Sequence, residues 1–227
     1  MITLSIEQSS AQGSIALLRG ERILSERSWE ATWRQTQQLF ALLPEMLSEA
    51  LVQPTDIDVF AAGLGPGSFA GCRVAVAAAC AFAVPDGRLV FGISSGEALA
   101  YDIFTETTAA AVVVVGDARR QHVWQGQFAR GELWPIMTKP WALHPMDRLA
   151  EVLPEDAVIV SPDWDRLGGQ LKQDCPHGAT LLEARRLPIA GTLGLLAYRK
   201  VRSGQLSESL SPIYLHPAIR PDWKGGK

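Results

Sequence analysis

The chain has 227 residues, 47% of them hydrophobic, which is enough to bury the core of one large domain or of two small ones. Its 21 lysine and arginine residues against 24 aspartate and glutamate residues give a net charge of −3, so the composition shows no overall electrostatic footprint for nucleic acid. The basic residues near the C-terminus are typical of a solvated helix end and tail. They include Arg199, Lys200, Arg202, Lys224 and Lys227.

Localisation signals and cysteine spacing both point to a reduced, cytoplasmic protein. The opening MITLSIEQSS has no basic region ahead of an apolar core, so it does not resemble a signal peptide. The apolar runs look too short or too interrupted to span a bilayer, and we expect no membrane contact. The three cysteines, Cys72, Cys80 and Cys175, are odd in number and lack metal-site spacing.

The first half of the chain predicts three strands, followed by helices that alternate with strands. Residues 2–7 alternate apolar and polar side chains, as a half-buried strand does. Leu39, Leu43, Met46, Leu47 and Leu51 recur at helical spacing. The expected elements are strands at 2–7, 13–20 and 21–29, a helix at 36–51, a strand at 57–64, a helix at 68–83, a strand at 88–93 and a helix at 95–104.

The second half predicts the same order of elements without repeating the residues. The expected elements are strands at 109–117, 122–129 and 132–137, a helix at 144–153, a strand at 157–162, a helix at 163–173, a strand at 179–184 and a helix at 188–204. Each half is therefore β-β-β-α-β-α-β-α, the order of a ribonuclease-H-like unit. We expect an α/β fold with two tandem lobes, residues 1–104 and 105–227, as in the actin, Hsp70 and sugar-kinase superfamily. This analogy concerns the fold and does not fix an activity.

The glycine-rich stretch GLGPGSFAG, at residues 63–71, fits no phosphate-binding motif well. A P-loop needs a lysine near Gly71, and none is present. Gly65, Gly67 and Ala70 match a dinucleotide fingerprint, but the next strand ends without the acidic residue that would hold a ribose. A nucleophile elbow fails because Pro66 stands where glycine is required. The remaining interpretation is a tight turn, with Ser68 capping the next helix.

The helix that follows Ser68 has no obvious face for water. No residue from Val74 to Val84 is charged or strongly polar, and six alanines keep its surface flat. Such a helix is either wholly internal or half-covered by a partner. Because the final helices of a small lobe of this kind lie on the outside of the sheet, we favour a partner surface.

Three stretches carry a resemblance to one protein family, and the resemblance covers the whole chain. GPGSFAGCRVAVAAACAFA resembles the Gly-Pro-Gly-Ser-Phe/Tyr-Thr-Gly-Leu-Arg-Ile-Gly signature of the TsaB (YeaZ) family. VVVVGDARRQHVWQGQF is similar to the family's strand that ends in Asp-Ala-Arg and the strand after it. SPIYLHP is similar to the family's Pro-x-Tyr-Leu-Arg ending.

The resemblance implies a non-catalytic dimerisation subunit, required for threonylcarbamoylation of adenosine 37 in tRNA. Such a subunit pairs with a catalytic TsaD-type relative through helices of its N-terminal lobe. The resemblance also implies a TsaE-type ATPase subunit in the complex, and a possible homodimer when the subunit is isolated. The subunit would contact tRNA only through the complex, and no cofactor is implied. The expected partner-binding residues are Leu39, Leu43, Met46, Leu47, Gly65, Pro66, Gly67, Ser68, Phe69, Gly71, Arg73, Ala77, Cys80 and Ala81.

The chain departs from the family pattern at several positions. Glu7-Gln8-Ser9 replaces the usual Asp-Thr-Ser at the first turn, where an acidic residue of active relatives places metal and phosphate. Ala70 replaces threonine and Cys72 replaces leucine, while Gln35-Thr36 stands for the usual His-Ser. These changes indicate a divergent member.

Catalytic alternatives find little support in the residues. Some relatives carry a metallopeptidase label, but His122, His144, His177 and His216 never lie three or four residues apart, as helix-borne zinc ligands would. Asp117-Ala118-Arg119-Arg120 could hold an anionic group, although a hairpin turn is the commoner reason for such a stretch.

Two other hypotheses remain open beside the scaffold. One is an ATP-dependent phosphotransferase of the same superfamily, with Glu7 and Ser9 near the phosphate. The other is a self-associating homodimer that uses the apolar helix.

Overall fold

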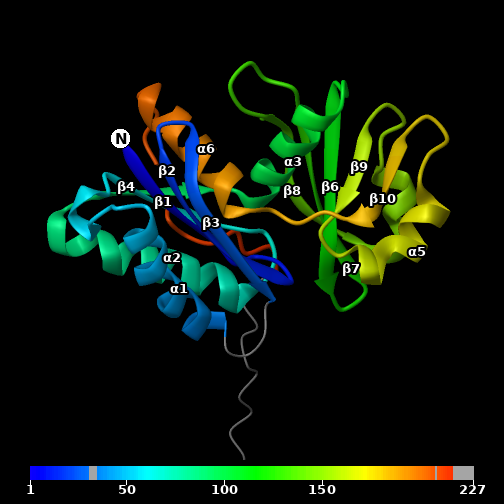
Figure 1. The fold of residues 1–227 in the computed structure, drawn as a ribbon. Helices are drawn as coiled ribbons and strands as arrows, with labels where there is room; N and C mark the ends of the chain where they lie inside the picture. The colour runs from blue at the N-terminus through cyan, green and yellow to red at the C-terminus, as the bar shows by residue number, and fades with distance from the viewer. Residues whose placement is uncertain (31–34, 208, 217–227) are drawn as a thin grey trace, which may run out of the picture.

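The computed structural model describes residues 1–30, 35–207 and 209–216. For Gln35, Thr36 and Gln37 it describes the backbone alone. The basic tail predicted around Lys224 and Lys227 therefore lies outside the described residues. Two five-stranded sheets stand side by side, and helices cover them (Figure 1).

Both sheets have the same topology. The first contains β1 (Ile2–Glu7), β2 (Gln12–Arg19), β3 (Arg22–Glu30), β4 (Val59–Gly63) and β5 (Leu89–Ile93), in the spatial order β3-β2-β1-β4-β5. The second contains β6 (Ala111–Arg119), β7 (His122–Ala129), β8 (Ile136–Pro145), β9 (Val158–Ser161) and β10 (Thr180–Arg185), in the order β10-β9-β6-β7-β8. In each, the three leading strands pair antiparallel and the other two add in parallel. This confirms the predicted α/β fold with two ribonuclease-H-like lobes.

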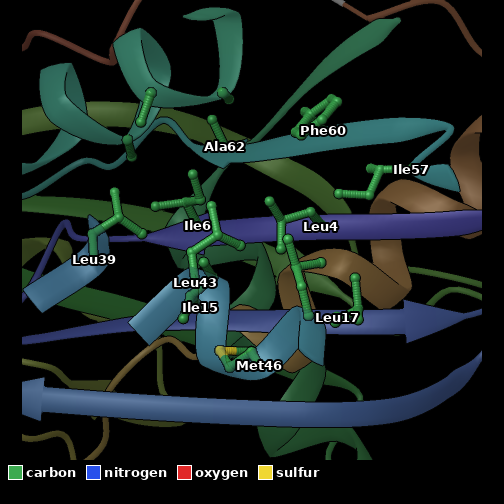
Figure 2. Packing of buried hydrophobic residues seen from close by; sticks show 14 of the residues in the cluster. Leu4, Ile6, Ile15, Leu17, Leu39, Leu43, Met46, Ile57, Phe60 and Ala62 are labelled. Atoms are coloured by element: carbon green, nitrogen blue, oxygen red, sulfur yellow. The ribbon is translucent and has the colours of Figure 1, made fainter. Parts of the chain in front are cut away.

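Helices α1 (Gln35–Glu49) and α2 (Phe69–Ala83) share one face of the first sheet. Leu39, Leu43 and Met46 of α1 point into a core formed with the inward side chains of β1 and β2 (Figure 2). Burying one such side chain contributes roughly 1.5–3 kcal/mol. The helical spacing of these residues thus reflects attachment of α1 to the first sheet.

Helices α3 (Ser95–Glu106) and α6 (Ala190–Arg202) connect the two halves. Although α6 is close to the end of the chain, it packs on the other face of the first sheet, where Leu193 and Leu196 meet Phe91 and Ile93. The Ser5 hydroxyl of β1 donates a 2.6 Å hydrogen bond to the Ala190 carbonyl. Helix α3 supplies side chains to the cores of both sheets. The predicted domain boundary between residues 104 and 105 stays a prediction.

The second sheet carries the short helix α4 (Leu149–Val152) and α5 (Trp164–Asp174) on one face. Here two expectations were wrong. The strand predicted at 132–137 is β8, which begins at Ile136 and runs to Pro145, and the helix predicted at 144–153 is reduced to a 3-10 turn (Met146–Arg148) and α4. Trp134 instead packs against the core beside α6. In the described residues β8 pairs only with β7, and such an edge strand tolerates Pro140.

Helix α2 and the 3-10 turn after it (Val84–Asp86) make an 18-residue segment, Phe69–Asp86, with a mean hydropathy of 1.4. By length and composition this segment could cross a membrane, which corrects the expectation that every apolar run is too short. A single helix of this kind is weak evidence, because core helices pass the same test. In this chain its inner side packs on the first sheet.

The C-terminal segment, of which Ser207 and residues 209–216 are described, contacts both lobes. The Gly92 N–H donates to the Ser207 hydroxyl at 3.1 Å, and the Ile213 N–H donates to the Leu64 carbonyl at 2.8 Å. The segment ends with Nε2 of His216 at 2.5 Å from the Ala118 carbonyl oxygen in the second lobe. This segment therefore fastens the lobes to each other beside the start of α2.

Candidate functional site

The glycine-rich turn places α2 close against the β1–β2 connection. Gly65 and Gly67 have φ angles of +86° and +153°, a region that favours glycine. A Cβ on Gly67 would collide with the Ser9 carbonyl, whose oxygen accepts a 2.7 Å hydrogen bond from the Ser68 N–H. The Ser68 hydroxyl accepts from the Gly71 N–H at 3.2 Å and so caps α2. The interpretation as a turn with a Ser68 cap is confirmed.

Helix α2 has an inner side and an outer side that the apolar sequence did not distinguish. Ala75, Ala78 and Ala79 are buried against the sheet. The exposed residues recur every three or four positions, so they form one face of the helix. We call this face, with the residue just beyond the helix end, the α2 face. It consists of Phe69, Ala70, Arg73, Ala77, Ala81 and Val84.

The α2 face is apolar apart from one guanidinium group. Phe69 is 58% exposed and Val84 is 76% exposed. The Arg73 guanidinium lies over the Phe69 ring at 5.2 Å and makes no ion pair within the described part of the chain. The Phe69 ring also contacts the ring of Tyr214, which comes from the C-terminal segment, with 4.8 Å between the ring centroids. An exposed aromatic pair therefore stands at one end of a stripe of small side chains.

The leucines predicted for partner binding on α1 lie in the core. Leu39, Leu43, Met46 and Leu47 are each at most 9% exposed. They therefore anchor the helix and leave its outer side to other residues. On that outer side, Phe40 is 49% exposed and its ring contacts Phe82 of α2 edge-on at 5.8 Å. The sequence analysis missed Phe40, whose only signal was an aromatic residue off the periodic apolar stripe.

The other predicted partner-binding residues fall into two groups. Gly65, Pro66 and Gly71 are buried and build the turn. Gly67 is exposed, Ser68 is half-buried at the helix start, and Cys80 is half-buried beside Ala77 and Ala81. The structure thus brings Phe69, Arg73, Ala77 and Ala81 onto one exposed face, with Cys80 at its margin. Their binding role stays a prediction.

Glu7, which stands where active relatives place an acidic residue, is sealed inside the first lobe. Its carboxylate accepts hydrogen bonds from the Ser9 N–H at 2.5 Å and from the Ser95 hydroxyl at 2.6 Å. Burial raises the pKa of Glu7, and these hydrogen bonds offset part of that rise. The side chain is 0% exposed. Its described contacts make it a structural carboxylate that fixes the turn at Ser9.

A cavity of about 1120 Å³ lies between the lobes. Ser9, Ser68 and Ser95 line it on the side of the first lobe, and Asp117 and Arg119 line it on the other side. The C-terminal segment forms part of its wall through residues 212–216. A cavity of this size can hold a small-molecule ligand, since such pockets measure about 300–1,000 Å³.

Neither a cysteine nucleophile nor a metal site gains support from the described residues. Cys72 borders the cavity, but burial, together with the charge of Glu7, raises the pKa of its thiol to about 12. It is therefore a protonated thiol at neutral pH, not a nucleophile. In residues 1–30, 35–207 and 209–216 no three His, Cys, Asp or Glu side chains gather where they could hold a metal ion.

The Asp117–Arg120 stretch, expected to be a hairpin turn, instead forms the end of β6 and the start of the turn, which consists of Arg120 and Gln121. The Asp117 carboxylate accepts a 2.8 Å hydrogen bond from the Arg119 N–H, so it closes the turn. The Asp163 carboxylate lies beside Asp117, and burial is the main reason why the pKa of Asp163 is raised.

Comparisons with known proteins point to one family. A family model described as "TsaD: tRNA N6-adenosine threonylcarbamoyltransferase" matches residues 30–143. The chain is 32% identical over 171 residues to the "tRNA threonylcarbamoyladenosine biosynthesis protein TsaB" of Haemophilus influenzae, covering 71% of this chain and 72% of that protein. It is 27% identical over 166 residues to the Escherichia coli protein of the same name, covering 68% of this chain and 71% of that protein.

A solved structure, "YeaZ from Pseudomonas aeruginosa", is similar over nearly the whole molecule. It superposes with a TM-score of 0.80 at 26% identity, covering 94% of this chain and 99% of the other. The shared fold, the glycine-rich turn with its capped helix and the sequence identity agree. The chain belongs to the TsaB (YeaZ) family.

Proposed function

We propose that this protein takes part in threonylcarbamoylation of adenosine 37 in tRNA, as a non-catalytic scaffold subunit that pairs with a TsaD-type catalytic subunit. The names of its relatives support a place in threonylcarbamoyladenosine biosynthesis. The observation that carries the scaffold role is the α2 face. It is exposed and apolar, and its single charged residue is Arg73.

A scaffold fits the local chemistry better than a catalyst does. Glu7 is buried and hydrogen-bonded on both oxygens, so it has little freedom to bind a metal or a phosphate. The Cys72 thiol, with a pKa of about 12, is a poor nucleophile. Both groups instead support the turn from which α2 starts.

The partner proposal follows from the family model as well as from the surface. The matching model is that of TsaD, and it spans residues 30–143, which include α1 and α2. A TsaD-type subunit would therefore carry a related pair of helices, and two related subunits can join through equivalent faces. The same face would support a homodimer when the partner is absent. We also propose a TsaE-type ATPase in the complex and a cytoplasmic location, on the family resemblance alone.

A phosphotransferase is the second candidate, and the observation in its favour is the cavity between the lobes. Ser9 borders that cavity, as a phosphotransferase would require. Glu7, the other residue expected near the phosphate, is buried and does not line the cavity.

The test combines assembly with activity. The purified protein is mixed with the TsaD-type subunit of its own cell, and the complex is isolated by size-exclusion chromatography. Formation of threonylcarbamoyladenosine in a tRNA transcript is then followed with and without this chain. We expect a stable complex and modification that depends on it. A complex that fails to form, with modification unchanged by omission of this chain, would refute the proposal.

A further inference from the structure

The turn between β6 and β7 holds three consecutive non-glycine residues in the left-handed region. The φ angles are 63° for Arg119, 52° for Arg120 and 59° for Gln121. Non-glycine residues are uncommon in this region, and such backbone clusters at functional sites. A relaxed two-residue hairpin would have glycine or asparagine here. The geometry of the turn alone therefore does not account for two arginines and a glutamine at these positions.

Three surrounding groups hold this turn in place. The Asp117 carboxylate accepts from the Arg119 N–H at 2.8 Å, and the Gln121 carbonyl accepts from the Met146 N–H at 2.9 Å. The ring Nδ1 of His122 lies 2.8 Å from the Arg120 carbonyl oxygen. The backbone is therefore fixed on each side of Arg120, while the Arg120 side chain projects without an ion pair within the described residues.

Two carboxylates lie beneath the neighbouring guanidinium groups and position them. Asp117 pairs with Arg119 at 3.3 Å and with Arg166 of α5 at 3.2 Å, and Asp163 pairs with Arg166 at 3.7 Å. The Asp117 side chain is only 10% exposed, against 63% for Arg119 and 49% for Arg166. The carboxylates thus face inward, and the guanidinium groups keep N–H donors free toward solvent. Because these ion pairs hold the guanidinium groups in place before a ligand arrives, binding costs less conformational entropy.

These groups surround a small pocket, which we call the arginine pocket. Its volume is about 270 Å³, below the roughly 300–1,000 Å³ of pockets for drug-sized ligands, so it fits one small group. Three guanidinium groups and one carboxylate, that of Asp117, line the pocket. Asp163 pairs with Arg166 from outside the lining, so even with both carboxylates counted one positive charge is in excess. The lining residues are Asp117, Arg119, Arg120, Gln121, Met146, Arg166 and Leu167.

We propose that the arginine pocket binds a phosphate group. Arginine presents planar N–H donors that match phosphate oxygens, and pairs of this kind are stronger than neutral hydrogen bonds. The phosphate could belong to an RNA strand or to a free phosphorylated small molecule. The RNA source rests on the proposed function, because a tRNA-modifying complex must hold tRNA. Phosphate binding itself does not depend on that function.

The test uses the full-length protein and compares Arg120→Ala with Arg22→Ala. Arg22 is an exposed arginine at the hairpin between β2 and β3 of the first lobe, so its substitution changes the net charge equally. Inorganic phosphate is titrated by calorimetry, and a tRNA transcript is titrated in a salt series. We expect Arg120→Ala to weaken phosphate binding about tenfold, because one charge-assisted hydrogen bond is lost. The slope of log affinity for tRNA against log salt should fall by about one.

The two probes separate the sources. If Arg120→Ala weakens both, an RNA phosphate occupies the pocket; if it weakens only inorganic phosphate, the ligand is a free phosphorylated molecule. Arg120→Lys, which keeps the charge, should retain part of the affinity, and the melting temperature should not change. The proposal is overturned if Arg120→Ala binds both probes as the unaltered protein and Arg22→Ala do. Assembly with the TsaD-type subunit is measured independently, so either proposal can fail without the other.

Discussion

Helices α2 and α5 occupy equivalent places in the two lobes but have different surfaces. Each follows the fourth strand of its lobe and precedes the fifth (Figure 1). The outer side of α5 is polar, with Asp165 paired to Arg185 at 3.2 Å and Lys172 paired to Glu183 at 2.5 Å. The outer side of α2 carries alanines and Arg73.

This difference shows that the fold does not require an apolar outer side at this position. Both helices bury one side against a sheet of the same topology, and α5 does so with a solvated outer side. A bare α2 face therefore calls for a separate explanation, and a protein partner supplies one. The polar surface of α5 is correspondingly the natural place for control substitutions.

The largest expected effect comes from giving α2 the polarity of α5. We expect Ala77→Glu and Ala81→Glu to abolish pairing with the TsaD-type subunit and any self-association, while the melting temperature stays native. An unpaired carboxylate at the centre of an interface costs several kcal/mol, on the order of a thousandfold in affinity. Calorimetric titration with the partner and thermal unfolding measure the two quantities.

Two further glutamates and one control complete the series. Ala78 is 5% exposed, so Ala78→Glu should unfold the first lobe, whereas Cys80→Glu, at the margin, should weaken assembly and lower stability together. Gln173→Glu on the exposed side of α5 should change neither property. Normal assembly by both Ala77→Glu and Ala81→Glu would show that the α2 face is not an interface.

The helices shared by the lobes lead to the next prediction. Asp102 of α3 accepts a 2.6 Å hydrogen bond from the Thr192 hydroxyl of α6, and burial raises its pKa to about 6. An unfolded aspartate has a pKa of about 3.9, so the folded protein loses stability as the pH rises from about 4 to about 6. Asp102→Asn should remove that loss and raise stability at pH 7 by on the order of 1–3 kcal/mol.

Urea unfolding at several pH values measures this effect. The stability gain of Asp102→Asn over the unaltered protein should grow from pH 4 to pH 6 and then stay level. A gain that is the same at every pH would mean that titration of Asp102 is not its cause.

A smaller effect is expected from the different starts of the two helices. The Ser68 hydroxyl caps α2, whereas the Asp163 carboxylate at the start of α5 makes no cap and accepts from the Asp117 N–H at 2.9 Å. Ser68→Ala should therefore destabilise the protein by about 1 kcal/mol, and Ser68→Asp, which can still cap, should cost less. Thermal unfolding would contradict this if both variants lost the same stability.

The sequence predicted the order of elements well and the orientation of side chains less well. Alternation marked β1 as a strand, but the expectation that it is half-buried was wrong, because Thr3, Ser5 and Glu7 on its second face are also buried. Helical spacing in α1 follows from burial on one side, so that element was recognisable too. For the same reason the periodic leucines of α1 had to be core residues, and their assignment to a partner surface placed buried side chains at the interface. Phe40 lies off that period and was overlooked.

Other features left no local signal. In α2 every residue from Val74 to Val84 is apolar, so the sequence could not show which side is exposed. The contacts of Tyr214 and His216 with the two lobes join residues far apart in the chain, and no periodicity announces them. The left-handed backbone at Arg120 was equally hidden, since arginine does not favour it.

The smallest expected effect concerns ATP. We expect the isolated protein to bind ATP weakly or not at all, because the turn before α2 lacks the lysine of a phosphate loop and Glu7 is sealed beneath the Ser9 turn. Any weak binding should reflect the phosphate groups and the arginine pocket, so Arg120→Ala should remove it and Glu7→Gln should leave it unchanged. Micromolar, magnesium-dependent binding in calorimetry that Glu7→Gln abolishes would instead favour the phosphotransferase, since only that enzyme needs a carboxylate at the first turn.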